Sequence, residues 1–172
     1  MKKIVLTFGL LSGVVSAAMM AATMPFAEAI GFDRMLVVGY TSTVISFLFV
    51  YFGVRSYRDN VLGGQISFGK GFQAGILITL ISCFFYVSAW LIVYYNFIPD
   101  FADKYAAYLV EDQRANGASQ AEIDKVVEQG EQMKAMLANP LINAAVTFTE
   151  PFPVGLVITL ISAGVLKKRE GV

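Results

Sequence analysis

The residues of this sequence best suited to chemistry are a glutamate and two prolines, in the run Glu150-Pro151-Phe152-Pro153. Glu150 stands early in a long apolar stretch and is the one acidic or basic side chain positioned to lie inside a membrane. A carboxylate at that depth is costly unless it is paired, hydrated or protonated. Prolines withhold backbone N–H donors and break helices, and an acid beside a broken helix is a common transporter ion site. The pattern therefore marks Glu150, Pro151 and Pro153 as a candidate intramembrane or interfacial polar site, and cation or proton binding by Glu150 is one interpretation of it.

Two simpler roles for Glu150 remain open from the sequence. If its helix begins near residue 148, Glu150 lies at the outer membrane interface, where the helix dipole favours an anion. Pro151 would then occupy a first helical turn, which is an ordinary position for proline. Alternatively, Glu150 forms a structural ion pair with Arg34 or Lys104.

Most enzyme chemistry is excluded by what the sequence lacks. It has no histidine, which removes the usual general base near neutral pH and the commonest metal ligand. Its one cysteine, Cys83, allows neither an internal disulfide nor a thiol metal site within one chain. We therefore expect no catalytic residues, no metal, no cofactor and no enzyme activity. The net charge of zero gives no indication of nucleic acid as a partner.

The elements that would position Glu150 are transmembrane helices. Of 172 residues, 56% are hydrophobic and 15% are charged, and the charges cluster between long apolar stretches. A helix needs about 20 apolar residues to cross the hydrocarbon core, and four stretches are long enough, at about residues 4–24, 36–54, 72–98 and 141–166. The first stretch follows Lys2 and Lys3 as a signal peptide would. Its apolar run exceeds the usual length of about 7–15 residues, so we expect a retained helix.

Basic residues at the ends of these stretches predict the orientation. The short loop between the first two helices keeps only Arg34, and acids outnumber bases in the long loop after the third. Both chain ends are therefore predicted to lie in the cytoplasm. The bases that would flank the inner ends of the helices are Lys2, Lys3, Arg55, Arg58, Lys70, Lys167, Lys168 and Arg169.

The long loop, at about residues 99–140, has the pattern of an amphipathic helical hairpin. Ser119 and Glu122 fit a capping box, in which both side chains bind free N–H groups at a helix start. The hairpin would pack on the bundle or lie at the lipid headgroups; the alternative is a docking surface for a partner. The apolar residues of that candidate partner face are Ile123, Val127 and Leu137.

Small residues recur at every fourth position in three of the stretches. Because apolar burial does not drive helix association in lipid, helices must approach closely, and small residues permit this. We expect them to pack inside one bundle, and a face between two copies of the chain is the alternative. They are Gly9, Gly13, Ala17, Ala21, Gly71, Gly75 and Gly155.

Aromatic residues gather in the outer half of the third stretch. Tryptophan and tyrosine favour the membrane interface, which predicts an interfacial belt that includes Trp90, Tyr94 and Tyr95. Tyr86 lies deeper and is expected to find a hydrogen-bond partner inside the bundle.

Two runs of the sequence stand out. One extends from Tyr51 to Lys70 and contains Gly63-Gly64, and the other extends from Glu150 to Ala163. Together they resemble a small bacterial membrane family that is catalogued only as a domain of unknown function, common in Bacteroidetes and some Proteobacteria. The resemblance covers nearly the whole chain and is weakest in the long loop. It implies four helices, a retained first helix and a bacterial inner membrane, and it implies no activity.

The sequence thus predicts an all-α membrane protein with four transmembrane helices in one domain of residues 1–172. Both ends lie inside, and an extracytoplasmic helical hairpin separates the third and fourth helices. The leading hypothesis is a non-enzymatic accessory or interaction protein of the bacterial inner membrane, surrounded by lipid, with a membrane protein or a second copy as its partner. The alternative is a small transporter or channel component that uses Glu150, working as an oligomer because four helices rarely enclose a pathway alone.

Overall fold

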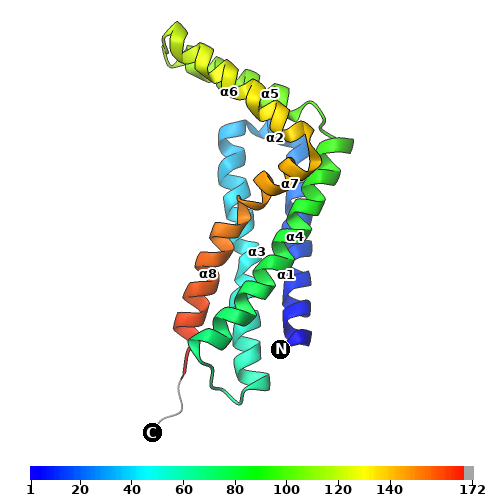
Figure 1. The fold of residues 1–172 in the computed structure, drawn as a ribbon, viewed down its shortest axis with the longest axis vertical. Helices are drawn as coiled ribbons and strands as arrows, with labels where there is room; N and C mark the ends of the chain where they lie inside the picture. Colours follow the sequence, from blue (N-terminus) through cyan, green and yellow to red (C-terminus); the bar gives the residue numbers. More distant parts are fainter. Residues whose placement is uncertain (169–172) are drawn as a thin grey trace.

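The computed structural model of the chain describes residues 1–168 and is built from helices (Figure 1). Arg169, one of the bases used to predict the orientation, lies outside these residues. In order, the elements are α1 (Lys2–Thr23), the short 3-10 helix η1 (Met24–Phe26), α2 (Ala27–Ile30), α3 (Phe32–Val61), α4 (Phe68–Asn96), α5 (Phe101–Ala115), α6 (Gln120–Ala138), α7 (Pro140–Phe148) and α8 (Pro151–Leu166).

Four helical segments of the described chain are long and apolar enough to cross a membrane. The predicted number of such helices is confirmed, and the chain is a multi-pass membrane protein. The second segment continues beyond the predicted residue 54 and includes Arg55 and Arg58, because the backbone hydrogen bonds of α3 extend past its apolar residues. The four segments are Lys2–Ile30, Phe32–Val61, Phe68–Asn96 and Pro140–Leu166.

The four segments stand side by side as a bundle, in which α4 contacts each of the other three (Figure 1). The N-terminus, the α3–α4 connection and the end of α8 lie at one end, which we call the basic end. α2, α5 and α6 lie at the opposite end. The basic side chains at the basic end are Lys2, Lys3, Arg55, Arg58, Lys70, Lys167 and Lys168.

Small residues bring α4 and α8 into close contact near the basic end. A Cβ atom added at Gly71 would lie 3.3 Å from the Cα atom of Ala163. One added at Gly75 would lie 2.8 Å from Cγ2 of Thr159. The hydroxyl groups of Thr79 and Thr159 lie 3.0 Å apart and share a hydrogen bond. Both helices therefore contribute small residues to one antiparallel interface.

The small-residue stripe of α1 follows α4 only along part of its length. Cβ atoms added at Gly9 and Gly13 would lie 2.9 Å and 2.8 Å from side chains of α4, whereas Ala17 is half-buried and Ala21 is exposed. The reason is geometric: a spacing of four residues rotates about 40° per step around a helix. Met20 takes the buried position that Ala21 would have had.

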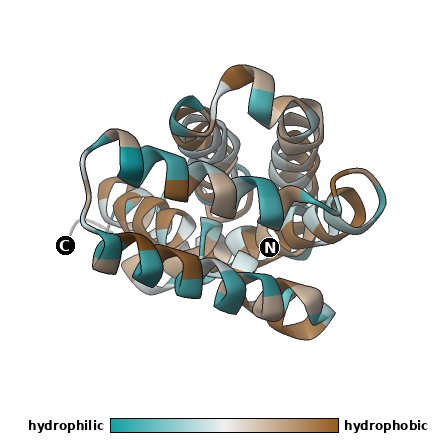
Figure 2. Ribbon diagram, turned by 90° about the horizontal axis from the view of Figure 1, so that it is seen from above, coloured by the Kyte–Doolittle hydropathy of each residue, from teal (hydrophilic) through white to brown (hydrophobic). Residues whose placement is uncertain are grey.

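α5 and α6 form a pair at the end opposite the basic end (Figure 2). The predicted capping box is present at the start of α6, where Ser119 accepts from the backbone of Glu122 and the Glu122 carboxylate binds the backbone of Ser119. Gly117, with φ of +75°, allows the tight turn between the two helices. A Cβ atom at Gly130 would lie 2.9 Å from that of Ala106, so the pair is closely packed.

Candidate functional site

The fourth span is broken where the sequence places its prolines. α7 ends at Phe148 and α8 begins at Pro151. Pro151 and Pro153 have no N–H group, so the carbonyls of Thr147 and Thr149 lose their usual helical donors. The carbonyl of Thr147 instead accepts the N–H of Glu150 at 3.2 Å.

Glu150 meets Tyr86 at this break. The hydroxyl group of Tyr86 on α4 donates a hydrogen bond to Oε2 of Glu150 at 3.3 Å. This is the deep tyrosine expected to need a partner, and the two residues lie 64 positions apart in sequence. Although Pro151 does occupy the first turn of α8, the Glu150 side chain makes no capping hydrogen bond. Among the described residues Glu150 has no ion pair, and Lys104 is paired elsewhere.

The length of α8 places Glu150 well inside the span. α8 has 16 residues, which corresponds to about 24 Å at the helical rise per residue. The hydrocarbon core is about 30 Å thick. A hydrocarbon core that begins at Leu166, just before Lys167, would therefore include Glu150 in its outer part. Its side chain is exposed on the surface of the single chain.

Tyr86 also lines a small internal cavity between α1, α3 and α4, with a volume of about 20 Å³. Hydroxyl-bearing residues form part of the lining of this cavity, and Met20, Met24, Met35 and Gly39 form the rest. The hydroxyl groups of Thr23 and Thr43 donate to carbonyls of their own helices, which leaves their oxygen lone pairs free to accept. A space of this size and polarity accommodates one water molecule. The hydroxyl-bearing residues of the cavity are Ser16, Thr23, Ser42, Thr43 and Tyr86.

A second polar cluster, centred on Asn143 of α7, was not predicted from the sequence. Asn143 is fully buried. Its Oδ1 atom accepts from Nε1 of Trp90 at 2.8 Å, and its Nδ2 atom donates to the carbonyl of Leu137 at 3.2 Å. Tyr95 donates to the same carbonyl at 2.8 Å. The only sequence signal was a polar residue inside an apolar stretch.

This cluster corrects the prediction of an interfacial aromatic belt. Trp90 and Tyr94 are only 7% and 6% exposed, so both rings face the protein rather than the lipid. The reason is that the indole N–H finds its acceptor in Asn143. Phe84 and Phe97, each 68% exposed, do lie at the lipid-facing surface.

The predicted partner face on α6 is not one exposed surface. Ile123 and Leu137 are 8% and 7% exposed, whereas Val127 is 46% exposed. Leu137 packs in a cluster with Trp90 and Met20 at the outer end of the bundle. Most of this apolar face is thus already covered within the chain, which leaves Val127 available.

Val127 opens onto a groove of about 740 Å³ between α5 and α6, which we call the α5–α6 groove. Half of its lining is apolar and half is charged. The apolar residues are Ala106, Ala107, Val110, Ala115 and Val127, and the charged ones are Asp103, Glu111, Arg114, Glu131 and Lys134. At one end Lys134 pairs with two carboxylates of the lining, at 2.6 Å and 3.3 Å. These hydrogen bonds raise the pKa of Lys134.

α5 is attached to the adjoining ends of the first two spans, at α2 and the start of α3. Lys104 pairs with Glu28 at 2.5 Å and with Asp100 at 2.8 Å, and these bonds raise the pKa of Lys104 and lower that of Asp100. Tyr108 donates to Asp33 at 2.5 Å, which raises the pKa of Tyr108 to about 12. The ring of Phe32 contacts those of Phe101, Tyr105 and Tyr108.

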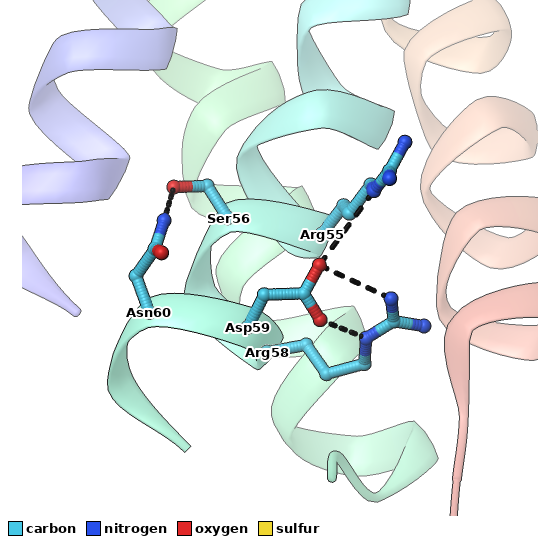
Figure 3. Close-up of polar contacts among 5 residues, drawn as sticks. All are labelled: Arg55, Ser56, Arg58, Asp59 and Asn60. Carbon is cyan, nitrogen blue, oxygen red and sulfur yellow. Dashed lines mark hydrogen bonds and ion pairs between the residues drawn. The ribbon is translucent and has the colours of Figure 1, made fainter. Parts of the chain in front are cut away.

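At the basic end, one carboxylate of α3 is shared by two arginines (Figure 3). Nε of Arg58 lies 2.6 Å from Oδ1 of Asp59, and Nε of Arg55 lies 3.6 Å from Oδ2. Asn60 donates to the hydroxyl of Ser56 at 3.0 Å. Within residues 1–168, no group of three His, Cys, Asp or Glu side chains is placed to hold a metal ion.

Four apolar helices with a broken fourth span and a helical pair at one end define a multi-pass α-helical membrane protein. The chain belongs to the family described as "Protein of unknown function (DUF4199)", whose model matches residues 7–168. The predicted resemblance to an uncharacterised family is confirmed. No curated protein and no solved structure matches the chain.

Proposed function

We propose that this protein is a non-enzymatic accessory protein of the bacterial inner membrane, and that a membrane-protein partner binds in the α5–α6 groove. The observation that carries the proposal is an open groove, lined by both apolar and charged side chains, in a part of the chain that lies outside the spans. The position of the basic residues supports an orientation with both chain ends in the cytoplasm. The groove then faces the extracytoplasmic side.

The attachments of α5 support this role, because a docking surface binds more tightly when its position is fixed beforehand. Glu28 and Asp33 hold α5 through Lys104 and Tyr108. At the other end of the pair, Leu137 joins α6 to the bundle. The groove is therefore presented in a defined position relative to the membrane.

The test is gentle-detergent purification of the tagged protein, with mass spectrometry of what accompanies it. We expect a stoichiometric companion that is lost in Val127→Asp, because a bound partner would remove water from a carboxylate that replaces an apolar side chain of the groove. Met136→Asp is the matched control, since Met136 is 43% exposed on the same helix and outside the groove. A protein that purifies alone, or a companion retained by Val127→Asp, contradicts the proposal.

A second candidate function is a small transporter or channel component that uses Glu150 as an ion or proton site, as an oligomer. The observation that favours it is the contact between Tyr86 and Glu150 at a helix break inside the span. Glu150→Gln is expected to abolish ion or proton flux in liposomes while the protein stays folded. Unchanged flux, or the absence of flux in the unaltered protein, argues against this function.

A further inference from the structure

Glu150 lies inside the fourth apolar span, Pro140–Leu166, and has no ion pair among the described residues. A carboxylate at this depth must be paired, hydrated or protonated. The described part of the chain shows no ion pair to Glu150, and the ion pairs of Arg55, Arg58, Lys104 and Lys134 all involve other acids. The side-chain hydrogen bond from Tyr86 supplies one donor for two carboxylate oxygens. Protonation is the remaining way to remove the charge within the chain itself.

The oxygen atoms around Glu150 fit a proton better than a metal cation. Hard cations such as Mg²⁺ and Ca²⁺ take six or more oxygen ligands. The hydrogen-bonded side-chain groups at this point are the carboxyl of Glu150 and the hydroxyl of Tyr86. The backbone carbonyls of Thr147 and Thr149, freed at the break, bring the total to fewer than six oxygen-bearing groups. A proton needs only one acceptor atom and one neighbouring group that can both donate and accept, and a phenol does both.

Tyr86 connects Glu150 to the small cavity between α1, α3 and α4. The cavity extends toward Thr23 and Met24, at the end of α1 farther from the basic end. α1 and α3 contribute hydroxyl groups to it, and Tyr40 of α3 is the other titratable group near Tyr86. None of the residues that line the cavity carries a charge. A water molecule there would lie beside Tyr86.

We propose that Glu150 and Tyr86 form a proton-binding site inside the membrane, reached from the outer end of the bundle through this cavity. When the site takes up a proton, a hydronium ion in the cavity gives that proton to the phenol oxygen of Tyr86 and becomes water. The original phenol proton passes to Oε2 of Glu150, which becomes a neutral carboxylic acid. Release of the proton reverses both transfers, so Tyr86 is neutral before and after.

This inference deepens the second candidate function, but it does not require transport. A site that binds a proton without moving it across the membrane would still be neutral, and it would make stability or partner binding depend on outer pH. The experiment must therefore measure proton occupancy directly and leave flux as a separate measurement.

Labelling by carbodiimides in native membranes measures this occupancy. Dicyclohexylcarbodiimide is apolar and reacts with protonated carboxyl groups, whereas a water-soluble carbodiimide with an added amine reports carboxyl groups exposed to water. We expect the apolar reagent to modify Glu150 at neutral pH at least about tenfold more than the soluble one. Its labelling should fall about tenfold per pH unit above the titration midpoint. Peptide mass spectrometry locates the adduct.

The matched control is Glu122, which is exposed at the start of α6 outside the spans and should show the opposite preference. Glu150→Gln should lose the apolar adduct and retain the labelling of Glu122. Failure of the apolar reagent to label Glu150 even at mildly acidic pH, or labelling of Glu150 by the soluble reagent as readily as Glu122, overturns the proposal. Labelling of Glu150 without flux in liposomes supports the site and removes the transporter function.

Discussion

The two halves of the fourth span are joined to α4 in different ways. Near the basic end, α8 meets α4 through small residues, with Gly71 against Ala163 and Gly75 against Thr159. Beyond the proline break, α7 meets α4 through the hydrogen bond between Asn143 and Trp90. The difference lies in the side chains: glycines let α8 approach α4 closely, whereas the amide of Asn143 on α7 needs polar partners and finds them in Trp90 and the carbonyl of Leu137.

The largest loss of stability should come from enlarging a glycine of α8, in the half of the fourth span that packs through small residues. In Gly155→Val, the new Cβ atom would lie 2.4 Å from Cγ2 of Thr79 and 2.9 Å from the ring of Phe47. Overpacking of this kind costs about 3 kcal/mol, and we expect a lower melting temperature in detergent and a lower yield. Gly164→Val is the control on the same helix, because a Cβ atom there meets nothing within 4 Å. Equal losses in both variants would show that close packing is not the cause.

A smaller effect should come from the hydrogen-bonded half. Asn143→Ala leaves the indole N–H of Trp90 without its acceptor, and interhelical hydrogen bonds in membranes are worth about 1–2 kcal/mol. Trp90 is the sole tryptophan, so its fluorescence during unfolding in mixed micelles reports this region directly. Asn96→Ala is the control, since Asn96 bonds only a carbonyl of its own helix. An unchanged midpoint and emission spectrum in Asn143→Ala would mean that the cluster adds no stability.

The same comparison shows what the sequence could predict. The number of spans, the helix break and the small residues at Gly71, Gly75 and Gly155 all follow from local patterns, because composition and spacing are properties of one helix. The exposure of Ala21 was missed, since a spacing of four residues drifts around a helix whose turn contains 3.6 residues. That error could have been found by extending the stripe with helical rather than fixed spacing.

The polar contacts could not be predicted, because each joins residues that are distant in sequence. Tyr86 and Glu150 were both singled out, but nothing local indicates that they meet. Trp90 was assigned to the lipid interface for the same reason, since its acceptor Asn143 lies 53 positions away. The burial of Leu137 likewise depends on where α6 packs against the bundle. The partners of Tyr86 and Trp90 and the burial of Leu137 are decided by how the helices pack against one another and not by local sequence preferences.

The smallest effect should be the response to acid, which separates the pair α5–α6 from the small-residue half. Hydrogen bonds with the side chain and backbone of Ser119 lower the pKa of Glu122. A carboxyl whose folded pKa is below its unfolded value of about 4.3 contributes stability above that pH and loses it as the pH falls through the folded pKa. We therefore expect the start of α6 to lose a few-fold of its hydrogen-exchange protection between about pH 5 and pH 3, after correction for intrinsic rates.

The interface between Gly75 and Thr159 carries no carboxylate, so protection along the contacting parts of α4 and α8 should not change over the same range. Glu122→Gln should make the start of α6 less protected at neutral pH and remove its dependence on acid, because the amide does not titrate. If α8 loosens together with α6, the two regions unfold as one unit. The start of α6 and the interface between α4 and α8 would then share one stability and would not open separately.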